Sequence, residues 1–190
     1  MSEAAPPEVV PEHPLLRALR ERFPDAVIAT HAYRGDLTAQ IAPASLIEVC
    51  TFLRDDPACA FDFLADVTAV DYIGAAPRFE LVYHLCSLSK HHRLRLKARV
   101  PEEQPRIASI VSVWRGADWL ERETFDMYGI QFEGHPDLRR IYLYAEFQGH
   151  PLRKDYPKEK RQPLVTVRDV SAEQAERTEA RLRDRYGRWT

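Results

Sequence analysis

The stretch Arg93-Leu-Arg-Leu-Lys-Ala-Arg-Val100 alternates strictly between basic and apolar residues. Successive side chains of a β-strand point to opposite faces of its sheet, so this alternation predicts a strand. One face would carry Leu94, Leu96, Ala98 and Val100, and the other Arg93, Arg95, Lys97 and Arg99. A strand with one apolar and one charged face suits a sheet that is covered on one side.

The neighbouring segments extend this sheet. Residues 61–72 and 79–88 are rich in β-branched and aromatic side chains, which favours strands, and residues 74–77 supply a break between them. Nearer the N-terminus, two apolar runs flank Arg34-Gly35 and predict a β-hairpin. Strands joined by short turns pair in antiparallel fashion.

Two amphipathic helices accompany these strands. The first is predicted over residues 14–23, and the second begins at Pro43 and continues to residue 56. The buried face of the second helix is expected to carry Leu46, Ile47, Cys50 and Leu53. The order helix, two strands, helix, three strands defines an α+β fold, with a largely antiparallel sheet and helices on one face.

Two short helices are predicted after the sheet. Ser109 is placed to cap the first, over residues 110–114, and the second covers residues 117–128 and ends before Gly129. Asp118 and Arg122, like Arg122 and Asp126, are four residues apart and would form ion pairs on the second helix. Its apolar contacts are expected from Trp119, Leu120, Met127 and Tyr128.

The chain divides into four parts. Residues 1–12 are predicted to form a flexible arm and residues 13–129 the α+β domain. Residues 130–163, called the extension from here on, have no sustained periodicity and are predicted to dock on a partner, since long irregular segments tend to be functional. Residues 164–190 form a tail with a helix expected over 171–186.

The bulk composition excludes several classes of protein. The 190 residues carry a formal net charge of -2, which gives no general attraction to nucleic acid or anionic membranes. Three cysteines without CxxC spacing predict neither an iron–sulfur cluster nor a disulfide framework, so a reducing compartment is expected. We find no secretory signal and no stretch approaching the roughly 20 apolar residues of a membrane span.

Acids and histidines are dense between residues 121 and 150, but their spacing does not favour catalysis. Glu121 and Glu123 are two residues apart on a helix and would point in different directions. His135 and His150 lie far apart, and no acid is placed as a third metal ligand. No GxGxxG, P-loop or GxSxG motif occurs.

The basic face of residues 93–100 leaves three interpretations open. It could be a solvated sheet face, follow a phosphate backbone, or meet acidic groups on a partner protein.

A dense motif occupies residues 117–143 and 148–157. It reads W-x-E-R-E, D-M-Y-G-I, F-x-G-H-P and L-R-R-I, followed by H-P-L-R-K-D-Y-P. This motif resembles the C subunit, also called the thirty-kilodalton subunit, of proton-translocating NADH:quinone oxidoreductase, respiratory complex I. The resemblance covers roughly residues 13–158. The sequence departs from it at Tyr144, Ala145 and Glu146, where relatives often carry Pro and Asp.

The resemblance implies a non-catalytic scaffold subunit in the peripheral arm, on the cytoplasmic side of the cell inner membrane. The complex transfers electrons from NADH through FMN and iron–sulfur centres to quinone and translocates protons. This chain would hold none of those cofactors, because they belong to partner subunits. It would pack on the large D subunit and neighbouring iron–sulfur subunits, bind no nucleic acid, and reach the membrane only through its partners. The isolated chain would be inactive.

The motif also assigns roles to residues. The helix that leads into the extension would be fixed by a charge network, and glycines would allow sharp changes of direction. Basic residues of the extension would pair with acids on the neighbour, and Asp155 would hold one of those bases in place. We therefore expect Arg139→Ala or Arg153→Ala to weaken assembly while leaving the isolated domain folded. The candidate docking and motif residues are Glu121, Arg122, Glu123, Asp126, Gly129, Gly134, His135, Pro136, Arg139, Arg140, His150, Pro151, Arg153, Lys154, Asp155 and Tyr156.

Three rival hypotheses remain at this point. A nucleic-acid-binding module would use the basic strand, and a stand-alone enzyme would use His135 and Glu123. The third is the equivalent subunit of a membrane-bound hydrogenase or a ferredoxin:quinone oxidoreductase.

Overall fold

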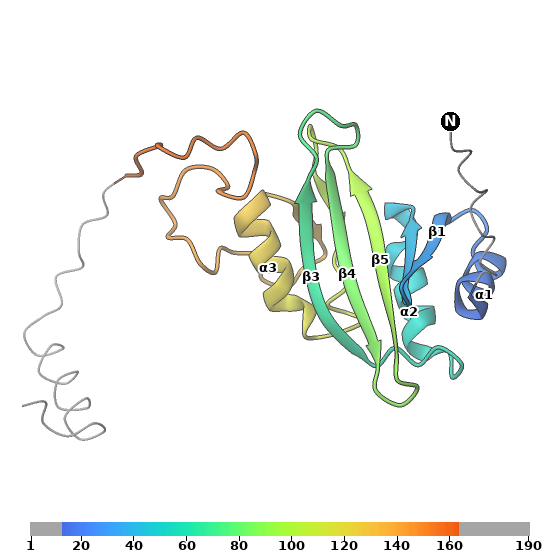
Figure 1. Ribbon diagram of the computed structural model, residues 1–190. Helices are drawn as coiled ribbons and strands as arrows, with labels where there is room; N and C mark the ends of the chain where they lie inside the picture. The colour runs from blue at the N-terminus through green and yellow to red at the C-terminus, as the bar shows by residue number, and fades with distance from the viewer. Residues whose placement is uncertain (1–12, 164–190) are drawn as a thin grey trace, which may run out of the picture. The chain divides into compact units, whose positions relative to one another are not determined.

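The computed structural model describes residues 13–163, and Figure 1 shows the arrangement of its helices and strands. The elements are α1 (Pro14–Arg22), β1 (Val27–Tyr33), β2 (Asp36–Ile41), the short 3-10 helix η1 (Pro43–Ser45), α2 (Leu46–Asp55), β3 (Phe63–Asp71), β4 (Phe79–Ser87), β5 (His92–Val100), β6 (Arg106–Ala108), α3 (Ala117–Tyr128) and β7 (Gln131–Glu133). The predicted N-terminal arm and the helix predicted over residues 171–186 lie outside the described residues.

The predicted strand at residues 93–100 is β5, the central strand of a five-stranded sheet with the order β1-β2-β5-β4-β3. Its alternation is confirmed, because Leu94, Leu96, Ala98 and Val100 are at most 2% exposed. All neighbouring strands are antiparallel except β2 and β5, which are parallel, and α2, β3 and β4 lie between them in the chain. The predicted α+β class and the largely antiparallel sheet are therefore confirmed.

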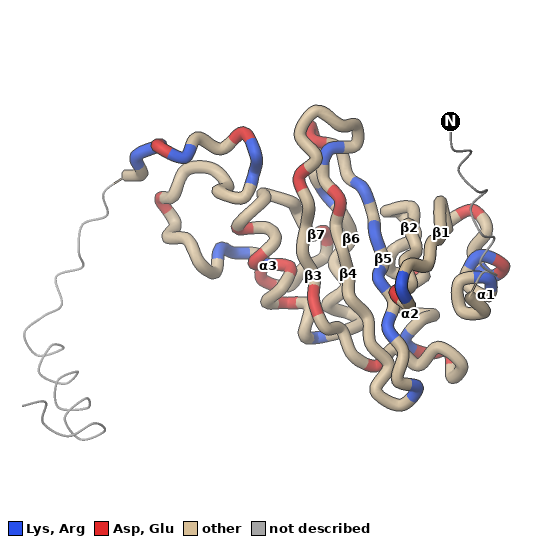
Figure 2. Tube along the Cα trace, in the orientation of Figure 1, with Lys and Arg blue, Asp and Glu red and all other residues tan. Residues whose placement is uncertain are grey.

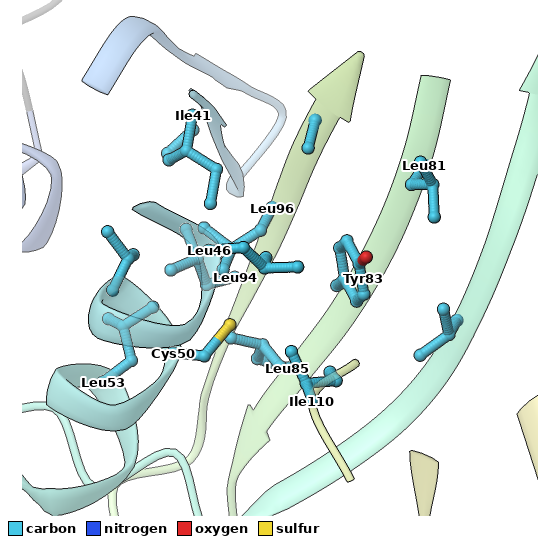
Figure 3. Close-up of a cluster of buried hydrophobic side chains, with 14 of the residues drawn as sticks. Ile41, Leu46, Cys50, Leu53, Leu81, Tyr83, Leu85, Leu94, Leu96 and Ile110 are labelled. Carbon is cyan, nitrogen blue, oxygen red and sulfur yellow. The ribbon is translucent and has the colours of Figure 1, made fainter. Parts of the chain in front are cut away.

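One face of this sheet carries the hydrophobic core. Figure 3 shows Leu46, Cys50 and Leu53 of α2 facing side chains of β4 and β5. Tyr83 at the middle of β4 is fully buried there, and both Cys50 of α2 and Glu121 of α3 lie close enough to affect its pKa, which burial raises. Helices α2 and α3 therefore meet the same face of the sheet.

The hairpin between β1 and β2 turns at Arg34-Gly35, as the sequence predicts. Both residues have positive φ, at 50° and 87°, which is the conformation that tight two-residue hairpin turns require.

Three expectations for the helices were wrong. Ile47 is 41% exposed, and Val49 takes its place on the buried face of α2. Trp119 is 66% exposed, because α3 turns Ala117, Glu121 and Thr124 toward the core instead. The helix predicted over 110–114 is a turn, in which the amides of Val113 and Trp114 donate to the Ile110 carbonyl.

The expected cap at Ser109 does exist at this turn. Its hydroxyl accepts a hydrogen bond from the Val111 amide at 3.3 Å. The same hydroxyl donates to Glu121, so the turn at residues 110–114 is bound to α3 and does not continue as a helix.

A second, two-stranded sheet joins the domain to the first residues of the extension. Strand β7 pairs in parallel with β6, and the Ser109 amide donates to the Glu133 carbonyl beyond the last strand pair. The rest of the described extension contains turns and bends.

Candidate partner-docking site

Helix α3 uses polar side chains to face the core, which is unusual for a buried helix. Glu121 is fully buried, accepting hydrogen bonds from the Ser109 hydroxyl at 2.6 Å and the Ile110 amide at 2.8 Å. Burial raises the pKa of Glu121 to about 7, although these two donors oppose that change. Thr124 donates to the Val67 carbonyl at 3.2 Å, which fixes α3 against β3. These contacts set the orientation of the helix that precedes the extension.

Asp126 holds the middle of the extension. Its side chain is fully buried, and one carboxylate oxygen accepts hydrogen bonds from three consecutive amides, those of Ile141, Tyr142 and Leu143, at 2.9–3.1 Å. The other oxygen forms an ion pair with Arg140 at 3.0 Å. Successive amides that converge on one anion make a compact binding nest, so the chain at 140–143 has a defined conformation.

The C-terminus of α3 is capped by a later part of the extension. The last carbonyl groups of any helix lack partners within the helix. Here the carbonyls of Asp126, Met127 and Tyr128 accept hydrogen bonds from the extension (distances 2.6–3.2 Å). The donors are His150 Nδ1, the Leu152 amide and Arg153 Nε, in that order. A cation at this end also complements the helix dipole.

Gly129 makes this close approach possible. Its φ is +74°, a left-handed conformation that ends the helix. A Cβ atom at this position would lie 2.5 Å from His150 Nε2 and 2.9 Å from the Arg153 guanidinium. Gly129 therefore serves both as the helix terminus and as space for the two side chains that cap it.

Arg78 links the end of the extension to the turn between β3 and β4. It is 2% exposed and forms two hydrogen bonds to Asp71, each of 2.7 Å. The same guanidinium also contacts Glu102, and it reaches Asp155 of the extension at 2.8 Å. Arg78 holds the pKa of both Asp71 and Asp155 below the ordinary value through these hydrogen bonds.

Several side chains of the extension remain exposed above these contacts. Tyr142 is 66% exposed and Leu152 48% exposed. Arg139 is 71% exposed on its side chain and pairs with Asp137, which is also exposed. Lys154 is exposed too, and among the described residues its ammonium group has no ion-pair partner. Aromatic and arginine side chains on a supported segment are the composition typical of protein interfaces.

The structure revises several expected contacts. Arg122 forms no ion pair with Asp118 or Asp126 within residues 13–163. Instead it donates to the carbonyl of Arg139 at 3.1 Å and lies over the Trp119 ring. Asp126 instead binds Arg140 and the backbone amides of residues 141–143.

Two of the basic residues expected to face a partner turn inward. Arg140 pairs with Asp126, and Arg153 caps α3 and lies over the Phe79 ring. Asp155 holds Arg78 rather than a base of the extension. Sequence reasoning missed Asp71 and Arg78 altogether. They lie on either side of the turn between β3 and β4, and their partners Lys154 and Asp155 follow 77 or more residues later in the chain.

The remaining motif residues have structural surroundings. His135 accepts from the Asp137 amide at Nδ1 and meets the Asp118 carbonyl at Nε2, so both ring nitrogens are hydrogen-bonded to backbone. This leaves no free nitrogen for the acid–base role of the stand-alone enzyme hypothesis. Tyr156 stacks on Phe147 and packs against Gly149. Glu123, Gly134, Pro136 and Pro151 lie at intermediate or exposed positions of this region.

Within residues 13–163, three of the four Lys and Arg side chains of β5 form ion pairs. Figure 2 shows the basic positions along this strand. Lys97 and Arg99 both pair with Glu80, which is 3% exposed, and Arg95 pairs with Asp36. Burial raises the pKa of Glu80, but the hydrogen bonds from Lys97 and Arg99 outweigh it and keep the pKa low. These three basic side chains share two carboxylates, so the pairing reduces the positive charge that a phosphate backbone would meet but does not cancel it.

A groove of about 650 Å³ lies beside this face, lined by residues that include Phe63, His84, Cys86 and Arg93. None of the candidate motif residues lines it. Within residues 13–163 no three His, Cys, Asp or Glu side chains are arranged to hold a metal ion. No helix among these residues has the length and apolar character to cross a bilayer.

The described residues form an α+β domain whose last helix, α3, is followed by an extension that folds back on it. A family model described as "Respiratory-chain NADH dehydrogenase, 30 Kd subunit" matches residues 39–162, and the chain belongs to this family. The predicted resemblance is therefore confirmed.

Curated relatives carry the corresponding name. The C subunit of the NADH-quinone oxidoreductase of Roseiflexus sp. (strain RS-1) is 48% identical over 75% of this chain and 82% of its own length. The equivalent subunit of Caulobacter vibrioides is 57% identical over 65% of this chain and 62% of its own length.

Two solved structures share the fold. A trypsin-resistant fragment of Nqo5 is 34% identical and matches 65% of this chain and 98% of that fragment, with a TM-score of 0.56. A chain of the membrane-bound sulfane sulfur reductase, an archaeal respiratory membrane complex, matches 93% of this chain and 91% of its own. Its TM-score is 0.66 and its identity 19%, which shows the fold alone.

Proposed function

We propose that this chain is a scaffold subunit of an NADH–quinone oxidoreductase of the respiratory chain, positioned in the peripheral arm. The observation that carries this proposal is the conformation of the extension. Hydrogen bonds to Asp126 and Met127 of α3 fix it, while Arg139, Tyr142 and Leu152 stay exposed. Membership of the thirty-kilodalton subunit family makes the chain one component of a hetero-oligomer. The names of the relatives favour NADH and quinone over the hydrogenase and ferredoxin alternatives.

The partner that we propose for the extension is the large D subunit, with iron–sulfur subunits as further neighbours. The exposed Arg139 and Lys154 suit a surface that carries carboxylates. FMN and the iron–sulfur clusters would belong to those partners, which would also perform the electron transfer. This chain would contribute no catalytic group, and it would lie on the cytoplasmic side of the cell inner membrane, held there by its partners.

The test is a gentle detergent extraction of membranes that carry a tagged form of this chain. Co-eluting proteins are identified by mass spectrometry, and the eluate is assayed for NADH:quinone activity. We expect the D subunit, iron–sulfur subunits and NADH-driven quinone reduction to elute together. Recovery of hydrogenase subunits without NADH activity would change the electron donor, and recovery of the chain alone would refute the proposal.

A further inference from the structure

Arg78 is the point at which the sheet meets the far end of the extension. Its guanidinium has almost no exposure to solvent, and it donates two hydrogen bonds to Asp71. Asp71 is the last residue of β3, and its side chain is itself fully buried. The loss of either partner of such a buried ion pair is strongly destabilising, because it leaves an uncompensated charge.

The extension is attached to this ion pair twice. The Asp155 carboxylate accepts two hydrogen bonds from Arg78, at 2.8 and 3.1 Å. The Lys154 backbone amide donates to Asp71 Oδ2 at 2.7 Å. One side chain and the adjacent backbone amide are therefore fixed by the same Arg78–Asp71 pair.

The residues just before this attachment are held by α3. The Leu152 amide donates to the Met127 carbonyl, and the Arg153 side chain lies over the Phe79 ring on which Arg78 also rests, each at 5.0 Å. The chain from 152 to 155 is thus bound on one side by a helix terminus and on the other by the end of a strand. Leu152 and Lys154 remain exposed between these contacts.

We propose that Arg78 is a positioning residue for partner docking: through Asp155 it holds residues 152–155 in the conformation that presents Leu152 and Lys154 to the neighbouring subunit. The inference rests on the proposed function, because it concerns how the same extension binds. A segment that is ordered before binding loses less conformational entropy on association. The fitting partner surface is an apolar recess for Leu152 with a carboxylate beside it for Lys154.

The chain supplies a matched pair of variants for the test. Asp155 and Glu102 both accept hydrogen bonds from Arg78, and their side chains are 50% and 54% exposed. Only Asp155 belongs to the extension. Asp155→Asn and Glu102→Gln each remove one negative charge beside Arg78 while nearly keeping the shape of the substituted side chain. Both leave the Arg78–Asp71 pair intact.

Three properties of each full-length variant are measured, one of which is the thermal midpoint of the domain. Hydrogen exchange is followed at the Leu152 and Lys154 amides, and the recovery of other subunits per tagged chain is quantified after detergent extraction. For Asp155→Asn we expect exchange to accelerate about threefold to tenfold, since the ion pair with Arg78 is lost and one acceptor oxygen replaces the two that now accept its hydrogen bonds. Recovery of partner subunits should fall, while the thermal midpoint of the domain stays close to wild type. Glu102→Gln should match the wild type in all three, and Asp155→Glu should restore recovery.

Equal effects of Asp155→Asn and Glu102→Gln would overturn the inference, since Arg78 would then be a general stabilising residue. Faster exchange with unchanged recovery would also overturn it, because the order of residues 152–155 would not matter for docking. If wild type itself recovers no subunits, the proposed function fails, whereas the exchange data alone show whether Arg78 holds the extension.

Discussion

Glu121 shows how a single residue can make the stability of the domain depend on pH. It is buried between the sheet and α3, and burial raises its pKa from 4.5 to about 7. The folded protein therefore binds this proton more tightly than the unfolded chain does. The resulting stabilisation is complete below pH 4.5 and disappears as the pH rises through 7.

We predict that Glu121→Gln removes this dependence. Between pH 5 and 8 the wild type should lose about 2–3 kcal/mol of unfolding free energy relative to the Gln variant. Urea denaturation at both pH values measures the difference. Asp71, Asp155 and Glu80 do not interfere, because their pKa values are lowered and they stay ionised throughout this range. A constant difference between the two proteins would contradict the assignment.

Alanine substitutions at Gly129 and Gly134 distinguish two contributions to the unfolding free energy, backbone strain and steric crowding. Both have positive φ, at 74° and 81°, but only Gly129 has neighbours within 4 Å of an added Cβ. Gly134→Ala should cost about 1–2 kcal/mol of unfolding free energy, the penalty of a left-handed residue. Gly129→Ala should cost about 1–3 kcal/mol more, because His150 and Arg153 must move. If urea denaturation gives equal losses of unfolding free energy for the two variants, His150 and Arg153 move aside without measurable cost.

At the scale of elements, α3 and the extension form one unit that depends on Asp126. Asp126→Asn keeps one acceptor oxygen for the three backbone amides but places its amide donor against the Arg140 guanidinium, which is also a donor. We predict a loss of about 2–4 kcal/mol of unfolding free energy, in the range for breaking a buried, hydrogen-bonded charge. Exchange should accelerate first at the amides of 141–143.

The control for this element is Asp137→Asn, which removes an exposed acid of the same extension. Exposed ion pairs contribute little, so its effect should stay within about 0.5 kcal/mol. Comparable losses for both variants would mean that Asp126 does not hold the extension.

The elements also show which features a sequence can predict. The strand at 93–100 was readable because its alternation is a local pattern that one covered face of a sheet enforces. The helix expected at 110–114 was wrong, because Ser109 is recruited by Glu121, a contact that depends on tertiary structure. The face of α3 was predicted only in part: Leu120 and Tyr128 do pack against the core, but Trp119 is exposed. Three of the buried positions, Glu121, Thr124 and Asp126, are polar, so hydrophobic spacing could not locate them.

At the scale of the whole molecule, the motif residues lie together on α3 and the extension, but several of their contacts differ from those expected. Glu121, Asp126 and Gly129 are indeed at the base of the extension, where acids and glycines were expected. Whether an arginine side chain points to the domain or to solvent depends on how the extension folds back on α3. Local residue spacing does not contain that information. The link from Arg78 to Asp155 spans 77 residues. Arg140 and Arg153 therefore turned out to be internal supports, and Arg139 remains an exposed candidate for docking.

This distinction sharpens the expected effects on assembly. Arg153→Ala should now loosen the cap of α3 as well as weaken assembly, since Arg153 Nε donates to the Tyr128 carbonyl at 2.6 Å. Arg139→Ala should affect assembly alone. Its side chain is 71% exposed, and its ion pair with Asp137 contributes little to folding. We predict a loss of partner affinity of about 2 kcal/mol, roughly thirtyfold, typical of an interface arginine.

Arg106→Ala is the matched control for Arg139→Ala. Arg106 is likewise exposed, at 56% of its side chain, and pairs with one exposed acid, Glu133, but it lies on β6 rather than on the extension. Recovery of partner subunits from detergent-extracted membranes should fall with Arg139→Ala and stay normal with Arg106→Ala, and both variants should keep the thermal midpoint of the wild type. Normal recovery with Arg139→Ala would move the docking contact away from residue 139. Reduced recovery with Arg106→Ala would extend it to the β6–β7 sheet, because both arginines present the same chemistry on different elements.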